Sequence, residues 1–349
     1  MSTRKALDVL KKITVGGKDI VSAGFLGSLS VEGDRAEVIL LLPDGLKGQA
    51  DSIRTAVEKR LMEEGFKPEV RYRIRESRPS LRVNVGPVGQ TKKRIPGVKR
   101  VIAVASGKGG VGKSTVAVNL AVALSKAGLR AGLFDADVYG PSVSVLMGLE
   151  GERVYVTPDK RFKPIEKYGI QVLTFGVLVK EDTPILWRGA MLHKAYEELL
   201  MQTAWEDVDV LVIDLPPGTG DSHLSLAQGY HIDGALVVTT PQIVAVADVL
   251  RAIKGFEKLE IPVLGIVENM AYFVCPESGR RYHIFGEGGA DRLSKHTGVP
   301  VIVRIPIDEY VSASGDSGIP VAHAYPEAPS SKAFLSLAND LKQTLLSGV

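Results

Sequence analysis

The fold of this 349-residue chain is decided by the stretch Val101-Ile-Ala-Val-Ala-Ser-Gly-Lys-Gly-Gly-Val-Gly-Lys-Ser-Thr115. An apolar strand runs directly into a glycine-rich loop, and a helix-forming segment, residues 116–126, follows it. The loop matches the pattern G-x-x-x-x-G-K-S/T in the strand–loop–helix context that a phosphate-binding loop requires. Glycines allow backbone N–H groups to surround an anion, and the start of the helix adds further unpaired donors. We therefore predict a nucleotide site here, and a plain glycine-rich turn is the less favoured alternative.

Two lysines occupy this loop, and we expect them to have different roles. Lys113 brings a positive charge to the β- and γ-phosphates, and the Ser114 hydroxyl is a candidate ligand of Mg²⁺. Lys108 directly follows the first glycine, Gly107, where an ordinary phosphate-binding loop needs no lysine. Because one loop does not readily aim two lysines at the same phosphate, Lys108 is either solvated or directed at a nucleotide held by a second subunit.

Composition and charge restrict the classes of protein to consider. Hydrophobic residues make up 45% of the chain and charged residues 24%, as in ordinary globular domains. The net charge of +3 is too small to indicate a nucleic-acid partner by itself. No apolar run approaches the length of a membrane span, and the N-terminus lacks the apolar core of a signal peptide, so we expect a cytoplasmic protein. The single cysteine, Cys275, excludes an internal disulfide and a four-cysteine metal site within one chain.

Residues 1–76 are predicted to form a small α+β domain. Apolar residues at helical spacing cover residues 4–13, and a second helix is expected to start with Asp51 as its N-cap and to stop at Gly65. Alternating patterns predict strands at residues 36–42 and 70–74.

Residues 77–99 are predicted to form a basic linker between two domains. The segment contains three prolines and several glycines and has no sustained periodicity. Its basic residues, Lys92-Lys-Arg94 and Lys99, together with the adjoining Arg100, are expected to be solvated rather than to bind nucleic acid.

Residues 100–349 alternate apolar strands with segments that can hold crossover helices. Strands are expected at residues 101–105, 131–134, 172–175, 210–215, 235–240, 263–267 and 301–305. Most of them are continuous apolar runs, which is typical of strands covered on both faces. The predicted fold is therefore a doubly wound α/β domain with a mostly parallel sheet, whose ligands bind beyond the carboxyl ends of the strands. A last amphipathic helix, with Leu335, Leu341 and Leu345 on one face, is expected to cover the sheet edge.

Carboxylates stand at two of the expected strand ends. Asp135 and Asp137 are two residues apart and are predicted to point the same way, one near a metal ion and one near the attacking water. A helix cap or a turn is the alternative role for this pair. Asp214 follows four apolar residues, which is the form of a carboxylate that holds Mg²⁺ through its water shell. The prolines and glycines of residues 215–221 indicate a loop that senses the γ-phosphate.

Together these motifs resemble the Mrp/ApbC family of iron–sulfur cluster carrier and scaffold ATPases. The loop at residues 107–114 is similar to the deviant Walker A motif of the wider MinD/ParA-like class of P-loop ATPases. Six further stretches resemble the family: Asp135-Ala-Asp-Val-Tyr-Gly-Pro-Ser142, Trp187-Arg-Gly189, Ile213-Asp-Leu-Pro-Pro-Gly-Thr-Gly-Asp221, Val238-Thr-Thr-Pro-Gln242, Val267-Glu-Asn-Met270 and Ile284-Phe-Gly286. The resemblance covers roughly residues 95–345. The first 76 residues resemble the small N-terminal domain of many bacterial-type members.

The resemblance implies a Mg²⁺-dependent ATPase that works as a homodimer with ATP at the interface. Lys108 would be the signature lysine that reaches the partner subunit's nucleotide, and Asp137 would position the attacking water. Ser114 and Asp214 would manage Mg²⁺, and Thr115 would meet the α-phosphate. The implied nucleotide-binding set is Gly107, Lys108, Gly109, Gly110, Val111, Gly112, Lys113, Ser114, Thr115, Asp135, Asp214, Asn269, Pro306 and Asp308.

The last three members of this set are implied to surround the base. Asn269 would contact the adenine, and the segment Pro306-Ile-Asp308 would flank it from the other side. Each polar residue has a simpler alternative role, because Asn269 could satisfy backbone groups at a strand end and Asp308 could cap a helix.

One feature of the family is altered in this chain. Members usually carry a Cys-x-x-Cys pair after the Glu-Asn-Met segment, and two such pairs in a dimer supply four thiolates for a 4Fe–4S cluster. Here Cys275 occupies the first position and Ser278 the second, and a serine hydroxyl is far less suited to iron. His283 lies eight residues beyond the cysteine, and we expect it to be an ordinary loop residue.

Two functions remain open at this point. The first is an ATP-gated carrier or assembly factor for iron–sulfur clusters, with apo iron–sulfur proteins or other assembly factors as partners. The second is a partner-regulating ATPase of the MinD/ParA-like class that does not itself hold a cluster. The second reading would need a basic amphipathic helix to bind a membrane or a clustered basic face to bind DNA, and the sequence favours neither.

Overall fold

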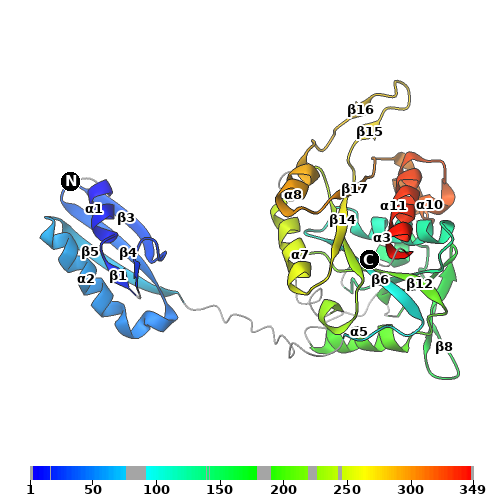
Figure 1. Cartoon of the computed structure of the whole chain (residues 1–349), viewed down its shortest axis with the longest axis horizontal. Coiled ribbons are helices and arrows are strands. Elements are labelled where there is room, and N and C mark those ends of the chain that lie inside the picture. Colours follow the sequence, from blue (N-terminus) through cyan, green and yellow to red (C-terminus); the bar gives the residue numbers. More distant parts are fainter. Residues whose placement is uncertain are drawn as a thin grey trace. The chain divides into compact units, whose positions relative to one another are not determined.

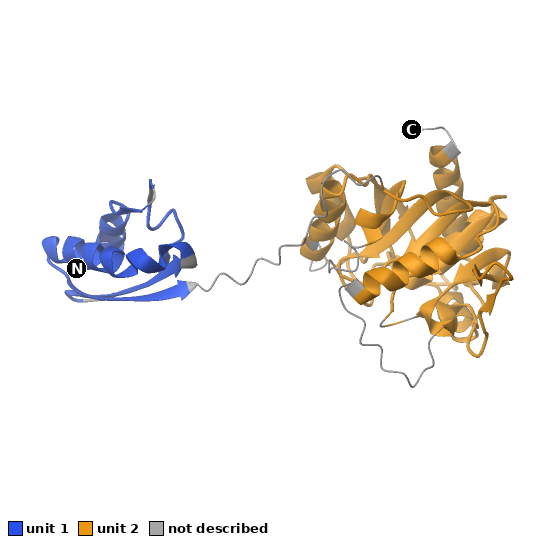
Figure 2. Cartoon of the chain, turned by 90° about the horizontal axis from the view of Figure 1, so that it is seen from below, with its two compact units in different colours: residues 1–90 blue, residues 91–349 orange. Residues whose placement is uncertain are grey.

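The computed structural model divides into two compact units, residues 1–90 and residues 91–349 (Figure 1, Figure 2). The structure describes residues 3–15, 17–75, 92–138, 140, 142–178, 190–218, 226–242 and 246–346. Each unit has its own hydrophobic core. Within these ranges, no helix has the length and apolar character that are needed to cross a membrane.

The first unit is a small α+β domain, as predicted. Its elements are α1 (Thr3–Leu10), β1 (Thr14–Val15), β2 (Lys18–Asp19), β3 (Leu26–Glu32), β4 (Arg35–Pro43), a 3₁₀ turn (Asp44–Gln49), α2 (Ala50–Glu63) and β5 (Lys67–Arg75). The sheet has the order β3-β4-β5, with β4 antiparallel to β3 and parallel to β5. Alternate residues of β4, from Ala36 to Leu42, are buried in the core that α1 and α2 share.

Two details of this unit differ from the prediction. Strand β3 was not expected, because its serines and glycine lack a strong apolar alternation. Asp51 is not the N-cap of α2, since a 3₁₀ turn leads directly into the helix and Gln49 occupies the capping position. Asp51 instead lies in the first turn, where its charge favours the positive end of the helix dipole.

The second unit is a doubly wound α/β domain. Its first half contains β6 (Val98–Ser106), α3 (Lys113–Lys126), β7 (Ala131–Asp135), α4 (Ser142–Leu146), β8 (Tyr155–Val156), β9 (Phe162–Lys163), β10 (Ile165–Lys167), β11 (Ile170–Leu173), a 3₁₀ turn (Phe175–Val177), α5 (Ala190–Gln202) and β12 (Val208–Asp214). Its second half contains β13 (Gly234–Thr239), α7 (Val246–Lys258), β14 (Val263–Glu268), β15 (Phe273–Val274), β16 (Arg281–Tyr282), α8 (Gly289–Thr297), β17 (Val301–Arg304), α9 (Glu309–Asp316), α10 (Val321–Ala324) and α11 (Pro329–Leu346).

The large sheet of this unit has the order β10-β11-β7-β12-β6-β13-β14-β17. All neighbouring pairs are parallel except β10 and β11, which form an antiparallel edge. Each of the seven predicted strands corresponds to a strand of this sheet. Strand β6, which feeds the glycine-rich loop, lies in the middle of the sheet, with β12 and β13 on either side of it.

Helices cover both faces of the large sheet (Figure 1). Val101, Ala103 and Ala105 of β6 face the core that includes α5, α7 and α8. Ile102 and Val104 face the opposite core, to which α3, α10 and α11 contribute. Because both faces of β6 are covered, all of its residues from Val101 to Ser106 are buried, which explains the continuous apolar run in the sequence.

The end of the predicted linker belongs to the second unit. Ile95 is buried in its core, and Lys93 forms a bridge to Tyr230. The basic residues here are not simply solvated, because Lys99 lies 2.7 Å from a carboxylate oxygen of Asp209 and Arg100 lies 2.8 Å from one of Asp233. Residues 76–91, the remainder of the linker, lie outside the described part of the chain.

The last helix, α11, packs against α3 and the edge strand β17. Leu341 is buried in this contact, as predicted, but Leu335 is 38% exposed. The buried face instead contains Phe334, Leu337 and Ala338. The predicted stripe was therefore wrong at Leu335, because a 3.6-residue period allows more than one apolar face on this leucine-rich helix.

Leu337→Ala should lower the free energy of unfolding of the second unit by about 2–5 kcal/mol, because it removes a completely buried side chain and leaves a cavity. Leu335→Ala, two residues away on the exposed face, should change stability far less. Urea unfolding followed by circular dichroism measures both variants. Equal losses would contradict the packing of α11.

Candidate functional site

The glycine-rich loop connects β6 to the N-terminus of α3, as the sequence predicts. Gly112 precedes the first helical residue, Lys113, and has a left-handed backbone with φ of 78°. A Cβ atom at Gly112 would lie 2.3 Å from Nδ2 of Asn269, so both conformation and space require glycine there. At Gly107 a Cβ atom would lie 2.5 Å from the backbone of Asp248 in α7. The loop is therefore confined between α7 on one side and the end of β14 on the other.

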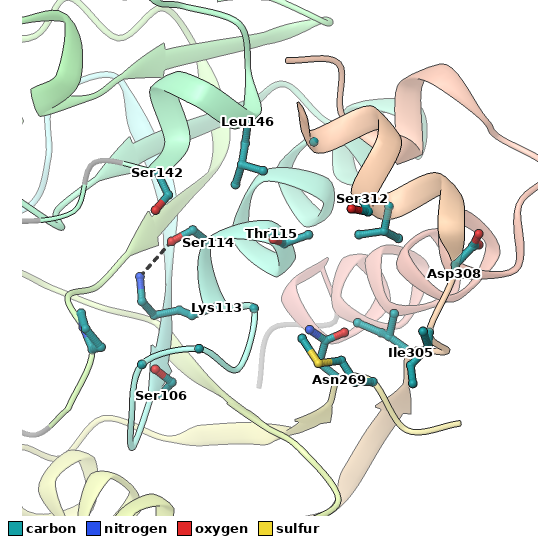
Figure 3. A pocket seen from close by; sticks show the side chains of 18 of the residues that line it. Ser106, Lys113, Ser114, Thr115, Ser142, Leu146, Asn269, Ile305, Asp308 and Ser312 are labelled. Carbon is teal, nitrogen blue, oxygen red and sulfur yellow. Dashed lines mark hydrogen bonds between the residues drawn. The ribbon is translucent and has the colours of Figure 1, made fainter. Parts of the chain in front are cut away.

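A cavity of about 790 Å³ opens in front of this loop (Figure 3). It is large enough for a nucleotide, since small-molecule sites measure roughly 300–1,000 Å³. Most of the predicted residues line it: Lys108, Gly109, Gly110, Gly112, Lys113, Ser114, Thr115, Asp137, Asn269, Pro306 and Asp308. Four predicted residues, Gly107, Val111, Asp135 and Asp214, do not line it.

One wall of the cavity was not predicted from the sequence. It consists of apolar side chains from several elements, among them Leu146, Met270, Phe285, Val311 and Phe334. In the sequence these residues are indistinguishable from ordinary core residues. Only the fold brings α4, α9 and α11 together around the far end of the cavity, where an apolar surface suits a nucleobase.

Lys113 is held by two carboxylates in the buried part of the site. Its ammonium group lies 2.7 Å from Oδ1 of Asp214 and 3.9 Å from Oδ2 of Asp137. It also lies 3.2 Å from the Ser114 hydroxyl, and this contact is the dashed line in Figure 3. Lys113 is 6% exposed and Asp214 is fully buried, so the pair lies at low dielectric. Burial raises the pKa of Asp214, and the charge of Lys113 opposes this effect.

The donor set at this point fits a magnesium ion. Oδ2 of Asp214 is buried and has no hydrogen-bond partner within the described ranges, although Oδ1 is bonded to Lys113. The Ser114 hydroxyl lies beside the same lysine and lines the cavity. A carboxylate oxygen and a hydroxyl are ligands that Mg²⁺ or its bound water accepts.

Asp135 lies behind the cavity and is bonded to protein groups. It is completely buried, with Oδ1 accepting the backbone N–H of Asp137 at 3.0 Å and Oδ2 accepting the Thr174 hydroxyl at 2.8 Å. Burial and the neighbouring charge of Asp214 raise the pKa of Asp135 to about 8. The two carboxylates have different surroundings, because β7 ends at Asp135 and only Asp137 lines the cavity. Asp135 thus fixes the backbone of Asp137, which is the member of the pair that reaches the cavity.

The polar residues at the far end of the cavity also have structural partners. Nδ2 of Asn269 donates to the backbone oxygen of Val111 at 2.9 Å and so joins the end of β14 to the loop. Asp308 is the N-cap of α9, where Oδ1 accepts the N–H of Tyr310 at 3.1 Å. Its Oδ2 accepts the Ser330 hydroxyl at 2.8 Å. Asp308 therefore has the helix-capping role that was its alternative, whereas Asn269 bonds the glycine-rich loop rather than a strand end. Both residues also line the cavity.

Cys275 lies on a hairpin formed by β15 and β16, which projects from the body of the unit (Figure 1). Its backbone N–H donates to the oxygen of Arg280 at 3.0 Å, and the N–H of Gly279 donates to its oxygen at 2.9 Å. The thiol is half-buried. A hydrogen bond from the Ser278 side chain, with the backbone N–H groups of Ser278 and Glu277, lowers the pKa of Cys275. The serine at the second position thus favours the thiolate of the first.

Among the described residues, Cys275 does not belong to a group of three or more His, Cys, Asp or Glu side chains that could hold a metal ion. His283 belongs to a different contact, with Nε2 3.6 Å from Oε2 of Glu287. The expectation that His283 is an ordinary loop residue agrees with this placement. The motif residues 187–189 and 219–221 lie outside the described ranges.

Solved structures with the same architecture bind nucleotides. A nucleotide-binding protein of Archaeoglobus fulgidus, solved in complex with ADP, matches with a TM-score of 0.58 at 41% identity and covers 64% of this chain and 88% of that one. MinD of Pyrococcus horikoshii, solved with Mg-ADP, shares the fold with a TM-score of 0.53 at 21% identity, over 72% of this chain and 98% of that one. The sheet order, the loop and these matches define a P-loop NTPase of the MinD/ParA-like class.

Sequence relatives identify the family within this class. The sequence model of the NUBPL iron-transfer P-loop NTPase family matches residues 97–342. A protein of Aquifex aeolicus named iron-sulfur cluster carrier protein is 54% identical over 260 residues, 74% of this chain and 71% of the relative. A protein of Helicobacter pylori with the same name is 36% identical over 348 residues, 99% of this chain and 93% of the relative. The chain belongs to the NUBPL iron-transfer P-loop NTPase family, which confirms the resemblance drawn from its motifs.

Ser278→Ala should raise the pKa of the Cys275 thiol, because it removes the side-chain hydrogen bond that stabilises the thiolate. The pH profile of alkylation by iodoacetamide should therefore move to higher pH, with slower reaction near neutral pH. Since Cys275 is the single cysteine, the label reports on this site alone. Ser278→Thr keeps the hydroxyl and should retain most of the effect. Identical profiles for the wild type and the alanine variant would exclude this role of Ser278.

Proposed function

We propose that this protein is a homodimeric ATPase that carries iron–sulfur clusters to recipient proteins and uses slow ATP hydrolysis as a switch. The observation that carries the proposal is the direct connection between the nucleotide cavity and the thiol. Asn269 and Met270 line the cavity, and the same segment continues into β15 and reaches Cys275 five residues later. Its relatives in A. aeolicus and H. pylori are named iron-sulfur cluster carrier proteins, which supports a cluster as the cargo.

Nucleotide binding rearranges the buried charges at the loop. The phosphates of ATP compete with Asp214 for the ammonium group of Lys113, which lies between the loop and the carboxylate. When Lys113 turns to the phosphates, both oxygens of Asp214 become available to Mg²⁺ and its water shell, together with the Ser114 hydroxyl. Mg²⁺ supplies electrostatic stabilisation of the transferred phosphoryl group. Asp137 lines the cavity beside this point and positions the attacking water.

Lys108 supplies the contact between subunits. Its side chain is partly exposed, and no ion pair is recorded for it with any described carboxylate. Lys108 can therefore contact the nucleotide of a facing subunit, whereas Lys113 contacts the nucleotide of its own subunit. A dimer closed by two such lysines holds each ATP between two subunits, and hydrolysis then releases the closed state.

The dimer brings together two Cys275 thiolates, one from each hairpin. Two thiolates leave coordination positions of an iron–sulfur cluster open, so the cluster is a bridging and easily transferred cargo rather than a resident cofactor. The lowered pKa of Cys275 favours the thiolate that must act as ligand. Recipient proteins complete the coordination with their own cysteines and take the cluster over.

A second candidate function is a partner-regulating ATPase that holds no cluster. The substitution of the second family cysteine by Ser278 is the observation that favours it. The nucleotide site is the same in both functions.

Substitutions of the two lysines of the loop should affect different properties, ATP binding for Lys113 and ATP hydrolysis for Lys108. Lys113→Ala should abolish ATP binding, because it removes the buried charge that meets the phosphates. Lys108→Ala should keep most of the ATP affinity but lose hydrolysis by about 10²-fold or more, since only the transition state would need the partner's lysine. Fluorescent-nucleotide titration and phosphate release measure the two properties. Tight ATP binding by Lys113→Ala, or normal hydrolysis by Lys108→Ala, would contradict the assigned role.

The cluster proposal is tested by anaerobic reconstitution with iron and sulfide. The wild type should bind about half a cluster per chain, as a dimer with one bridging cluster requires. Cys275→Ala should bind none, and Ser278→Cys, which restores the family pair, should retain the cluster longer against an iron chelator. Iron content and visible absorption are the readouts. If the wild type and Ser278→Cys both fail to bind iron while ATP is still hydrolysed, the second candidate function replaces the first.

A further inference from the structure

A second cavity, of about 350 Å³, lies at the base of the Cys275 hairpin. Tyr272, directly before β15, and His283, directly after β16, line it. Glu268 at the end of β14, Arg304 at the end of β17 and two acidic residues near α8, Glu287 and Asp291, complete its charged lining. This cavity shares no lining residue with the nucleotide cavity.

Glu268 gives the strongest indication that the cavity binds something. The residue is 4% exposed, and its Oε2 accepts from Nε of Arg304 at 2.8 Å. Its Oε1 is buried and accepts no hydrogen bond from any described residue. A buried carboxylate oxygen without a donor is unfavourable, so native proteins rarely leave one unpaired. A bound group that donates hydrogen bonds would satisfy it.

The charges around the cavity favour a cation as this group. Three carboxylates, Glu268, Glu287 and Asp291, line the cavity with one guanidinium, that of Arg304. The guanidinium of Arg281 lies beside the lining ring of Tyr272, so carboxylates still outnumber guanidinium groups. Arg304 is already shared, because its Nη2 donates to Asp291 at 2.6 Å. Glu287 has only a 3.6 Å contact with His283. The cavity therefore favours a bound group that carries a positive charge.

The ligand chemistry favours a guanidinium over a metal ion. No three of these side chains converge on one point in a way that suits a metal, as judged over the described residues. A guanidinium carries five donors in one plane and can bond two separated carboxylates at once. The ring of Tyr272 adds an aromatic face, and the guanidinium of Arg281 already lies 4.6 Å from the centre of that ring. One arginine is thus accommodated beside the cavity by this same ring.

We propose that this cavity recognises an arginine side chain of the recipient protein that docks on the Cys275 hairpin. The cavity adjoins both strands of the hairpin, so an arginine held there places its protein beside the thiol. Consecutive residues of one segment serve the two cavities, Glu268 the arginine site and Asn269 the nucleotide site. Binding of a recipient and of nucleotide is thereby coupled through the end of β14. The cationic site stands on its own geometry, whereas the identity of the docking protein rests on the proposed carrier function.

The test uses the full chain and a small probe, N-acetyl-arginine methylamide, followed by ¹H–¹⁵N NMR. The neutral isostere N-acetyl-citrulline methylamide is the matched control ligand. The arginine probe should shift the amide signals of Tyr272, Gly288 and Asp291 saturably, and citrulline should not. Glu268→Gln should weaken binding by about tenfold or more, because it removes one charge-assisted acceptor. Glu287→Gln, which leaves the Arg304 pair intact, should weaken binding as well, and Glu277→Gln on the hairpin outside the cavity should not.

The outcomes are unambiguous because the measurement needs neither ATP nor a cluster. Equal shifts with citrulline, or unchanged arginine binding by both Glu268→Gln and Glu287→Gln, would refute the site. Selective broadening of the same signals by micromolar Mn²⁺, with no response to arginine, would show a metal site and refute it too. Failure of cluster reconstitution would leave arginine binding intact and would remove only the identification of the partner as a cluster recipient.

Discussion

The contact between Lys113 and Asp214 is the constraint on which the arrangement of this site depends. It joins the loop after β6 to the end of β12, and these two strands are parallel neighbours in the sheet. Both groups are buried, and a buried pair is stable only while each partner remains, since removing one leaves a desolvated charge at a cost of about 3–5 kcal/mol. Phosphate is the natural competitor for the lysine, because it replaces one negative partner by another. The pair thus joins the two sides of the site through one contact.

The surroundings of this pair explain why so many polar groups are buried there. Asp135 is the register partner of Asp214 on the neighbouring strand, and it is prevented from reaching the cavity by its bonds to Thr174 and to the backbone of Asp137. Burial raises the pKa of Asp135 to about 8, and the nearby carboxylate of Asp214 adds to this effect, because two ionised carboxylates repel each other at low dielectric. A neutral Asp135 can anchor Asp137 without weakening the hold of Asp214 on Lys113.

The features that can be predicted from the sequence are those set by neighbouring residues, namely the glycine-rich loop and the buried strands. The glycine-rich loop lies between β6 and α3, as its spacing predicts, and Asp214 ends an apolar strand, as expected. The seven strands are found because burial on both faces demands continuous apolar runs. The sequence does not show that Asp137 lines the cavity whereas Asp135 is buried behind it, because β7 ends at Asp135. The apolar wall near Phe334 could not be found, since its members come together only through the packing of α9 and α11. The cavity around Glu268 could not be predicted either. Its charged residues are spread over 37 positions, from residue 268 to residue 304, and only the fold brings them together.

The end of β14 connects the two halves of the proposed function. Backbone bonds tie this segment to the strand beside it, from Ile305 N–H to Glu268 oxygen at 2.9 Å and from Ala271 N–H to Ile305 oxygen at 2.9 Å. A further bond, from Ile307 N–H to Tyr272 oxygen at 2.7 Å, continues the ladder to the base of the hairpin. Because Ile305 and Ile307 also line the nucleotide cavity, this ladder connects the wall of the cavity to the hairpin. The proposed coupling between nucleotide and thiol therefore follows the chain from β14 to Cys275 and the backbone bonds beside it, which a thiol on an isolated loop would lack.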